Sequence, residues 1–196
     1  MSGASPTRDR LVDTAARLFQ ERGYAATGLA EVLEAAQAPK GSLYHHFPDG
    51  KEGLAVAAVE RSAGRFLETL LKDAAASASS ADMVLRFASR LAGWLEQSGF
   101  RLGCPLATLA LEQAAISERL AGALSVAFAG WQEALAARLH ADGLDTGRSA
   151  ALARLSLCTI EGALILARTS RDSAPLRQAA ETLAGVIRQE TGPSRA

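Results

Sequence analysis

The stretch that decides the fold spans residues 27–47 and reads TGLAEVLEAAQAPKGSLYHHF. Its first part carries apolar residues at the spacing of one helical face, namely Leu29, Val32, Leu33 and Ala36. This spacing predicts a short amphipathic helix. Residues 37–39 break the pattern, and a second short helix is predicted from about Lys40 to Phe47, because proline is tolerated at a first helical position. Two short helices joined by a tight turn are typical of a helix-turn-helix motif.

The predicted second helix has two different faces. Leu43 and Phe47 point inward. The outer face carries hydrogen-bond donors and an aromatic ring, from Lys40, Ser42, Tyr44 and His45. Residues 39–48 contain no carboxylate. A carboxylate there would repel the phosphates of DNA. Because the second helix of such a motif enters the major groove and shows its N-terminal residues to base edges, this face predicts DNA binding.

The composition favours an all-helical protein that folds without a metal or cofactor. Apolar residues make up 48% of the 196 residues, six are proline, and alanine and leucine dominate. The two cysteines match no metal-ligand spacing. No run of residues looks apolar and long enough to span a bilayer, and no signal peptide is evident, so we expect a cytoplasmic protein without a membrane partner.

The charge of the chain is balanced, with 21 basic and 21 acidic residues. A strong overall attraction to nucleic acid is therefore absent. DNA binding would have to depend on a few well-placed groups and on the two-fold symmetry of a dimer.

Working outward, apolar periodicity and turn signals predict about nine helices. A first helix begins near Arg8, with Thr7 as its cap, and stops at Gly23. Residues 1–6 would form a flexible arm and residues 191–196 a frayed tail. Six longer helices follow the helix-turn-helix, over residues 51–75, 81–97, 105–114, 117–141, 145–171 and 175–189. We therefore predict an all-α fold with a three-helix N-terminal head, residues 1–50, and a larger ligand-binding and dimerisation body, residues 51–196.

Four segments in order resemble the DNA-binding signature of the TetR family of transcriptional regulators. They are GYAAT at residues 23–27, LAEVL at 29–33, KGSLYHHF at 40–47 and KEGL at 51–54. Any one of them would be weak evidence, but the ordered set is specific. The resemblance implies DNA contact through Thr27, Lys40, Gly41, Ser42, Tyr44, His45 and Lys51.

The resemblance also implies different roles within that set. Lys40, Ser42 and His45 would read bases, and Thr27, Tyr44 and Lys51 would hold phosphates. This sequence departs from the family pattern at Gly28, at the turn residues Gln37 and Pro39, and by one extra residue before Lys51. The extra residue puts the reach of Lys51 in doubt.

The larger body offers aromatic side chains for an apolar pocket, which are Phe66, Phe87, Trp94, Phe100, Phe128 and Trp131. Glu161, on a largely apolar helix, is a candidate polar anchor. The alternative is that these rings only fill the core, and that Glu161 is a satisfied core carboxylate or an interface residue. Residues 100–112 and 161–163, with Phe128 and Trp131, resemble the LmrA/YxaF-like branch of the family. That resemblance implies a repressor that senses a small apolar or aromatic effector.

Residues 100–112 add two further candidates for the ligand site, Cys104 and Leu109. Cys104 lies at a predicted helix start, where a thiolate is favoured, so a redox sensor is one interpretation. The other is a small buried apolar side chain.

The last two predicted helices carry apolar and small residues that can face a second copy of the chain. On the first of the two these are Leu152, Leu155, Thr159, Gly162, Ile165 and Leu166. On the second they are Leu176, Ala180, Leu183 and Ile187. Resemblance to the family implies a four-helix homodimer interface, and the alternative is that these side chains close the core of the monomer.

An enzyme would need a catalytic constellation or a metal site. Only three histidines exist, two of them in the predicted recognition helix, and no phosphate-loop or zinc motif occurs. We therefore predict a sequence-specific regulator and not an enzyme: a homodimeric repressor released from a palindromic double-stranded operator by a small effector. The alternative is a helical ligand-binding or interaction module without DNA binding.

Overall fold

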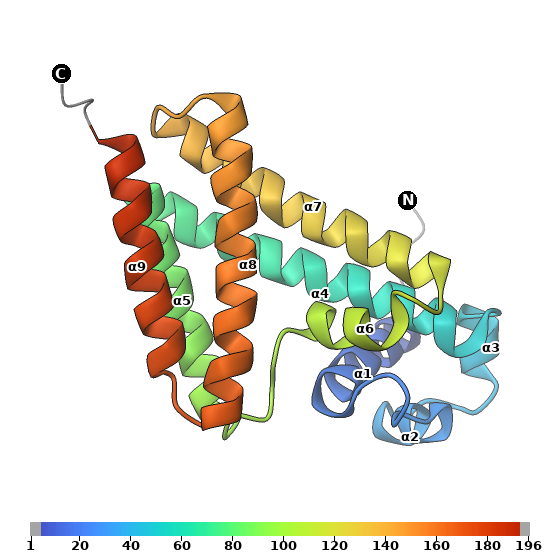
Figure 1. The fold of residues 1–196 in the computed structure, drawn as a ribbon. Helices are drawn as coiled ribbons and strands as arrows, with labels where there is room; N and C mark the ends of the chain where they lie inside the picture. Colours follow the sequence, from blue (N-terminus) through green and yellow to red (C-terminus); the bar gives the residue numbers. More distant parts are fainter. Residues whose placement is uncertain (1–4, 193–196) are drawn as a thin grey trace. The chain divides into compact units, whose positions relative to one another are not determined.

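The computed structural model describes residues 5–192, and every regular element within them is a helix (Figure 1). The helices are α1 Pro6–Arg22, α2 Leu29–Ala35, α3 Ser42–His46, α4 Gly50–Ala75, α5 Ser80–Gln97, α6 Pro105–Gln113, α7 Glu118–Ala141, α8 Thr146–Ser170 and α9 Ala174–Thr191. The predicted all-α class is confirmed, and the order and number of helices in the described part agree with the periodicity.

The chain packs as two compact units. The first unit combines the residues up to 65 with residues 104–127, and the second combines residues 66–103 with the residues from 128 onward. In this packing α4 and α7 each contribute residues to both units, and α6 packs against α1. The functional boundary predicted at residue 50 stays a prediction.

The first unit is built around α1, which contacts α2, α3 and α6. The apolar stripe of α1 is buried, with Leu11 and Phe19 almost inaccessible to solvent. Leu43 and Phe47 are also buried, so the predicted inward face of the second short helix is confirmed. These contacts hold α3 against α1 and leave its other face outward.

The start of α1 corrects a prediction. Pro6 occupies the first turn and Ser5 is the N-cap residue, so the helix begins before Arg8 and Thr7 is not its cap. Proline suits a first helical position because the N–H it lacks would have no partner there. Residues 1–4 of the predicted arm and residues 193–196 of the predicted tail lie outside the described residues; Thr191 ends α9 and Gly192 follows as its C-cap.

The second unit contains α5, α8 and α9, with α9 packed against the other two. Asp73, near the end of α4, is buried and accepts two hydrogen bonds from Arg90 of α5, at 3.0 and 2.6 Å. Burying a carboxylate is costly unless it is paired, so this contact ties α4 to α5. Asp145 caps α8 by accepting from the backbone N–H of Arg148, which stabilises the start of that helix.

Candidate nucleic-acid interface and ligand cavity

The recognition element of the first unit is α3 with the two residues before it. The helix is shorter than predicted, because the turn at Pro39 continues to Ser42, whose backbone N–H and hydroxyl both donate to the Pro39 carbonyl at 2.9 and 2.6 Å. Lys40, Gly41 and His45 are exposed, and Tyr44 is 63% exposed. The structure thus places these side chains on one accessible surface, while Ser42 is half-buried.

Thr27 is placed differently from the phosphate contact that the resemblance implied. Its side chain is 1% exposed, and its hydroxyl donates to the carbonyl of Gly23 at 2.8 Å. A hydroxyl turned inward to close a loop is not available to DNA. Thr27 therefore holds the segment between α1 and α2 in shape, which corrects the implied role.

Lys51 is half-buried in the first turns of α4. Its ammonium lies 4.3 Å from the centre of the Tyr24 ring, a cation–π contact. Burial lowers the pKa of Lys51, and the negative charge of Glu112 acts in the opposite direction. Gly50 has φ +63 and starts the helix directly before this lysine.

Glu112 of α6 also holds the loop that precedes α2. Its carboxylate accepts a hydrogen bond from the backbone N–H of Ala25 at 2.8 Å. Gly23 lies directly beside it with φ +84, and a Cβ at that position would overlap the carboxylate. Glycine is therefore required here both by the backbone and by the close approach of Glu112.

Further polar contacts join the segment after α3 to the start of α7. Arg119 forms an ion pair with Asp49 at 2.6 Å, and the Ser117 hydroxyl donates to Glu52 at 2.5 Å. On the other side, Arg61 of α4 pairs with Asp9 and Asp13 of α1. Each exposed pair stabilises weakly, but together they set the position of α4 within the first unit.

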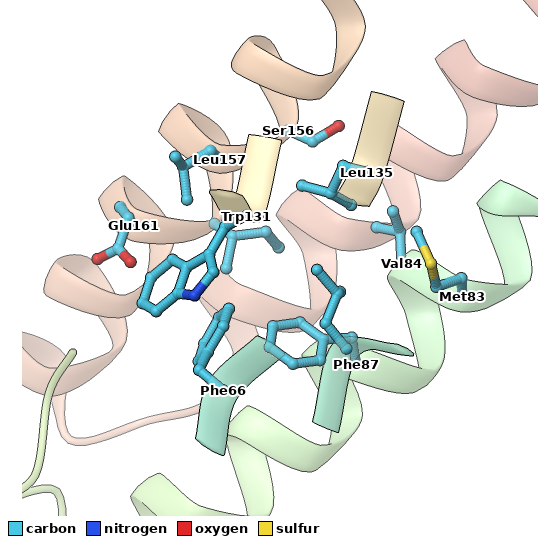
Figure 2. A pocket seen from close by; sticks show the side chains of 11 residues that line it. Phe66, Met83, Val84, Phe87, Trp131, Leu135, Ser156, Leu157 and Glu161 are labelled. Carbon is cyan, nitrogen blue, oxygen red and sulfur yellow. The ribbon is translucent and has the colours of Figure 1, made fainter. Parts of the chain in front are cut away.

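The second unit contains an apolar cavity that is partly open to solvent (Figure 2). Four helices line it, α4, α5, α7 and α8, through Phe66, Leu70, Met83, Val84, Phe87, Trp131, Leu135, Ser156, Leu157, Ile160 and Glu161. Phe66 stacks on Trp131 at 3.7 Å between ring centres and meets Phe87 edge-on at 4.8 Å. The apolar and aromatic lining is typical of a small-molecule site.

Five of the eight residues predicted for the ligand site do not line this cavity. Trp94 is 44% exposed on α5, and Phe100 lies in the loop after α5 with φ +61. Cys104 and Leu109 are buried in the first unit. Phe128 is not a lining residue either, and its ring meets that of Trp131 edge-on. The structure brings Phe66, Trp131 and Glu161 together, along with Phe87.

Seven lining residues are not among the predicted ones, because the prediction rests on aromatic rings and not on the residues one helical turn away from them. Leu70 follows Phe66 by one turn, and Leu135 follows Trp131 by one turn. Residues one turn apart share a helix face, so this spacing was a usable signal. Ser156 adds a hydroxyl, but it donates to the Leu152 carbonyl at 2.7 Å.

The residues predicted for the dimer interface divide into two groups. Leu152 of α8 is buried, as are all four predicted residues of α9, Leu176, Ala180, Leu183 and Ile187. They close the core of the protomer, as the alternative interpretation expected, and leave almost no surface for a partner. By contrast, Thr159 is half-buried, and Leu155, Gly162, Ile165 and Leu166 are exposed along α8.

The outward side of α8 makes this helix unusually apolar. By length and composition it is the one described helix that would be apolar enough to cross a membrane, and 39% of its most apolar window is buried within the protomer. Cys158 lies on the same exposed side. We define the α8 face as Leu155, Cys158, Gly162, Ile165 and Leu166.

Comparison with known proteins gives matches along most of the chain. The model for "Bacterial regulatory proteins, tetR family" matches residues 11–58, and "Transcriptional regulator LmrA/YxaF-like, C-terminal domain" matches residues 80–182. The HTH-type transcriptional regulator YxaF of Bacillus subtilis is 34% identical over 97% of this chain and 100% of its own. LmrA of the same organism is 32% identical over 87% of this chain and 90% of its own.

A solved structure agrees with these matches. A TetR transcriptional regulator from Chloroflexus aurantiacus superposes with a TM-score of 0.78 at 30% identity, covering 94% of this chain and 95% of that one. An accessible recognition helix carried by a larger helical body defines a helix-turn-helix regulator of transcription. The chain belongs to the TetR family, with a C-terminal domain of the LmrA/YxaF-like type. Its relatives are transcriptional regulators and not enzymes, as predicted.

Proposed function

We propose that this regulator is a homodimeric repressor that binds a near-palindromic operator and is released by a small apolar or aromatic effector. The observation that carries the DNA-binding part is the outer surface at α3. Lys40, Tyr44 and His45 are exposed there, and residues 39–48 contain no carboxylate. The carboxylate that follows them, Asp49, is paired with Arg119. Such a surface suits phosphates and base edges.

The proposed dimer uses the α8 face. Its apolar side chains, 49–62% exposed at Leu155, Ile165 and Leu166, are costly to leave in water. A second copy covers this face in the proposal, and Gly162 in its centre would permit close approach of two helices. Two-fold symmetry then presents two recognition helices to two half-sites about one helical turn of DNA apart, or somewhat more.

The proposed effector site is the cavity of the second unit. Phe66 and Leu70 of its wall belong to α4, the helix whose first residues follow α3 in the chain. A ligand can shift a conformational equilibrium only by its different affinity for the two states. In this proposal the effector prefers a displaced α4, and the operator prefers the other position. The protein would act in the cytoplasm, where the DNA is.

The direct experiment is footprinting of the full chain on DNA selected from a random pool. The expected result is protection of two symmetry-related half-sites, with binding that tightens as the dimer forms. Protection of one asymmetric half-site would contradict the dimeric arrangement. Failure to select any sequence would instead favour a ligand-binding module without DNA contact.

A further inference from the structure

The helix-turn-helix is held on both of its sides by one short stretch of the chain, residues 112–119. Before α2, the carboxylate of Glu112 accepts a hydrogen bond from the backbone N–H of Ala25 at 2.8 Å. After α3, Arg119 pairs with Asp49 at 2.6 Å. These partners are 87 and 70 residues apart in the sequence. One stretch of the first unit therefore contacts the chain both before and after the recognition helix.

We infer that Glu112 is a positioning residue for α3. Through its hydrogen bond with Ala25 it holds the helix-turn-helix in the arrangement that binds DNA, and it does not itself touch DNA. This inference rests on the proposed operator binding and adds a residue outside the helix-turn-helix that controls the strength of that binding.

The loop between α1 and α2 is where such a contact has the largest effect. The Thr27 hydroxyl donates to the Gly23 carbonyl at 2.8 Å, but this bond closes the loop on itself. Glu112 supplies a fixed point from a different helix. A Cβ on Gly23 would overlap the Glu112 carboxylate, so the loop packs directly against that side chain. The direction of the loop sets where α2 begins, and α3 follows α2 after one short turn.

The same carboxylate also acts on the start of α4. Lys51 lies over the Tyr24 ring at 4.3 Å, and the negative charge of Glu112 favours the charged form of this lysine. Tyr24 belongs to the loop that Glu112 holds, so the start of α4 packs on that loop. Because α3 lies between α2 and α4 in the chain, fixing the beginning of both neighbours restricts α3.

This restriction bears on affinity because DNA binds one arrangement of the helix-turn-helix. The apparent affinity falls with the fraction of molecules that hold the binding-competent arrangement. A hydrogen bond to a charged group contributes more than one between neutral groups. Losing the contact with Glu112 would let the loop take up other arrangements, and operator binding would weaken although no DNA contact is removed.

The test compares three variants in operator titrations. Glu112→Ala removes the hydrogen bond and should weaken operator binding about tenfold. Glu112→Gln keeps an oxygen that can accept from Ala25, so its affinity should stay within about threefold of that of the unaltered chain. Glu118→Ala is the matched control, because it removes the same charge from an exposed position in the same stretch, and it should not weaken binding.

Two results of these titrations would overturn the inference. The first is an operator affinity of Glu112→Ala equal to that of the unaltered chain. The second is an equal loss in Glu112→Gln and Glu112→Ala, because the charge, and not the hydrogen bond with Ala25, would then be the cause.

Hydrogen exchange at single amides gives a readout that needs no operator. In the unaltered protein the Ala25 amide should be protected, although Ala25 is exposed. In Glu112→Ala this amide and those of residues 42–46 should exchange about tenfold faster, while the amides of α9 in the second unit keep their rates.

The exchange experiment separates this inference from the proposed function. If the unaltered chain selects no DNA sequence, operator binding fails as a function, and the exchange rates of residues 42–46 still decide whether Glu112 positions α3. Equal rates with and without the carboxylate would overturn the inference. An unprotected Ala25 amide in the unaltered protein would also overturn it, and that measurement needs no variant to fold.

Discussion

Lys40 and Lys51 illustrate how two lysines near one recognition helix receive different roles from their surroundings. Lys40 is exposed just before α3, where a side chain would reach the groove in the proposed complex. Lys51 is half-buried over the Tyr24 ring, within reach of the charge of Glu112. A lysine that packs on a ring in its own unit is less free to neutralise a phosphate, so the two side chains should respond differently to truncation.

We expect Lys40→Ala to weaken the free energy of binding to the preferred operator by about 1–3 kcal/mol. Binding to scrambled DNA should weaken much less, because a base contact carries sequence preference. Lys51→Ala should lower stability by about 0.5–1 kcal/mol through the lost cation–π contact and leave the salt dependence of binding unchanged. Operator titrations at several salt concentrations measure both. A salt slope reduced by about one phosphate in Lys51→Ala would restore the phosphate role that the family pattern implies.

Thr27 makes a second prediction at the scale of one residue. Thr27→Val keeps the shape of the side chain but leaves the buried Gly23 carbonyl without its 2.8 Å hydrogen bond. We expect a loss of about 1–3 kcal/mol in the free energy of unfolding. Thr27→Ser is the control, since it keeps the hydroxyl and removes only a methyl group. Unchanged stability with a loss of operator affinity would show that the hydroxyl faces DNA after all.

The inward and outward faces of the short helices could be predicted from local periodicity, because each face is decided by residues within two turns. The environments of Thr27 and Lys51 could not. Thr27 turns inward because of the loop conformation around Gly23, which depends on Glu112, 85 residues further along the chain than Thr27. A contact of that separation leaves no periodic signal in either segment.

At the scale of the element, α8 and α9 show that the apolar residues of a helix do not reveal whether they pack in the core or against another chain. Both carry enough apolar residues to suggest an interface. The apolar stripe of α9, with Leu176, Ala180 and Leu183, is buried inside the protomer. By contrast, α8 has apolar residues on both its buried side and its exposed side. Its inner side, with Ile160 and Leu164, packs in the core and leaves the α8 face exposed, where we propose that a second chain binds. Sequence periodicity located both stripes but could not assign either to core or surface.

We therefore expect Ile165→Asp to convert the dimer to monomers, because two charges would be buried against each other across the two-fold axis. Ile165 is 55% exposed in the protomer, so the monomer should keep its helical circular dichroism spectrum. Leu111→Asp is the matched control, since Leu111 is an exposed apolar residue of α6 outside the α8 face. Sedimentation velocity distinguishes the species, and an Ile165→Asp variant that sediments as a dimer would locate the interface elsewhere.

At the scale of the whole molecule, the proposed function needs two binding sites on one chain. Residues of α4 contribute to both compact units: Asp9 and Asp13 are paired with Arg61 in the first unit, and Phe66 and Leu70 line the cavity in the second. A helix that belongs to both is a natural carrier of coupling, but coupling is a free energy that has to be measured.

Trp131→Phe tests that coupling without emptying the cavity. Phenylalanine retains an aromatic ring against Phe66 but removes part of the cavity wall, so we expect effector affinity to fall. Operator affinity measured without effector should stay within about twofold, because truncation effects stay local when no shared contact is broken. In the unaltered protein the effector should weaken operator binding about 5–150-fold, and the operator should weaken effector binding by the same factor. Both affinities are measured by titration with and without the other ligand. If an effector occupies the cavity and both factors equal one, the two sites are independent, and release of the operator must begin somewhere other than at the wall formed by Phe66 and Trp131.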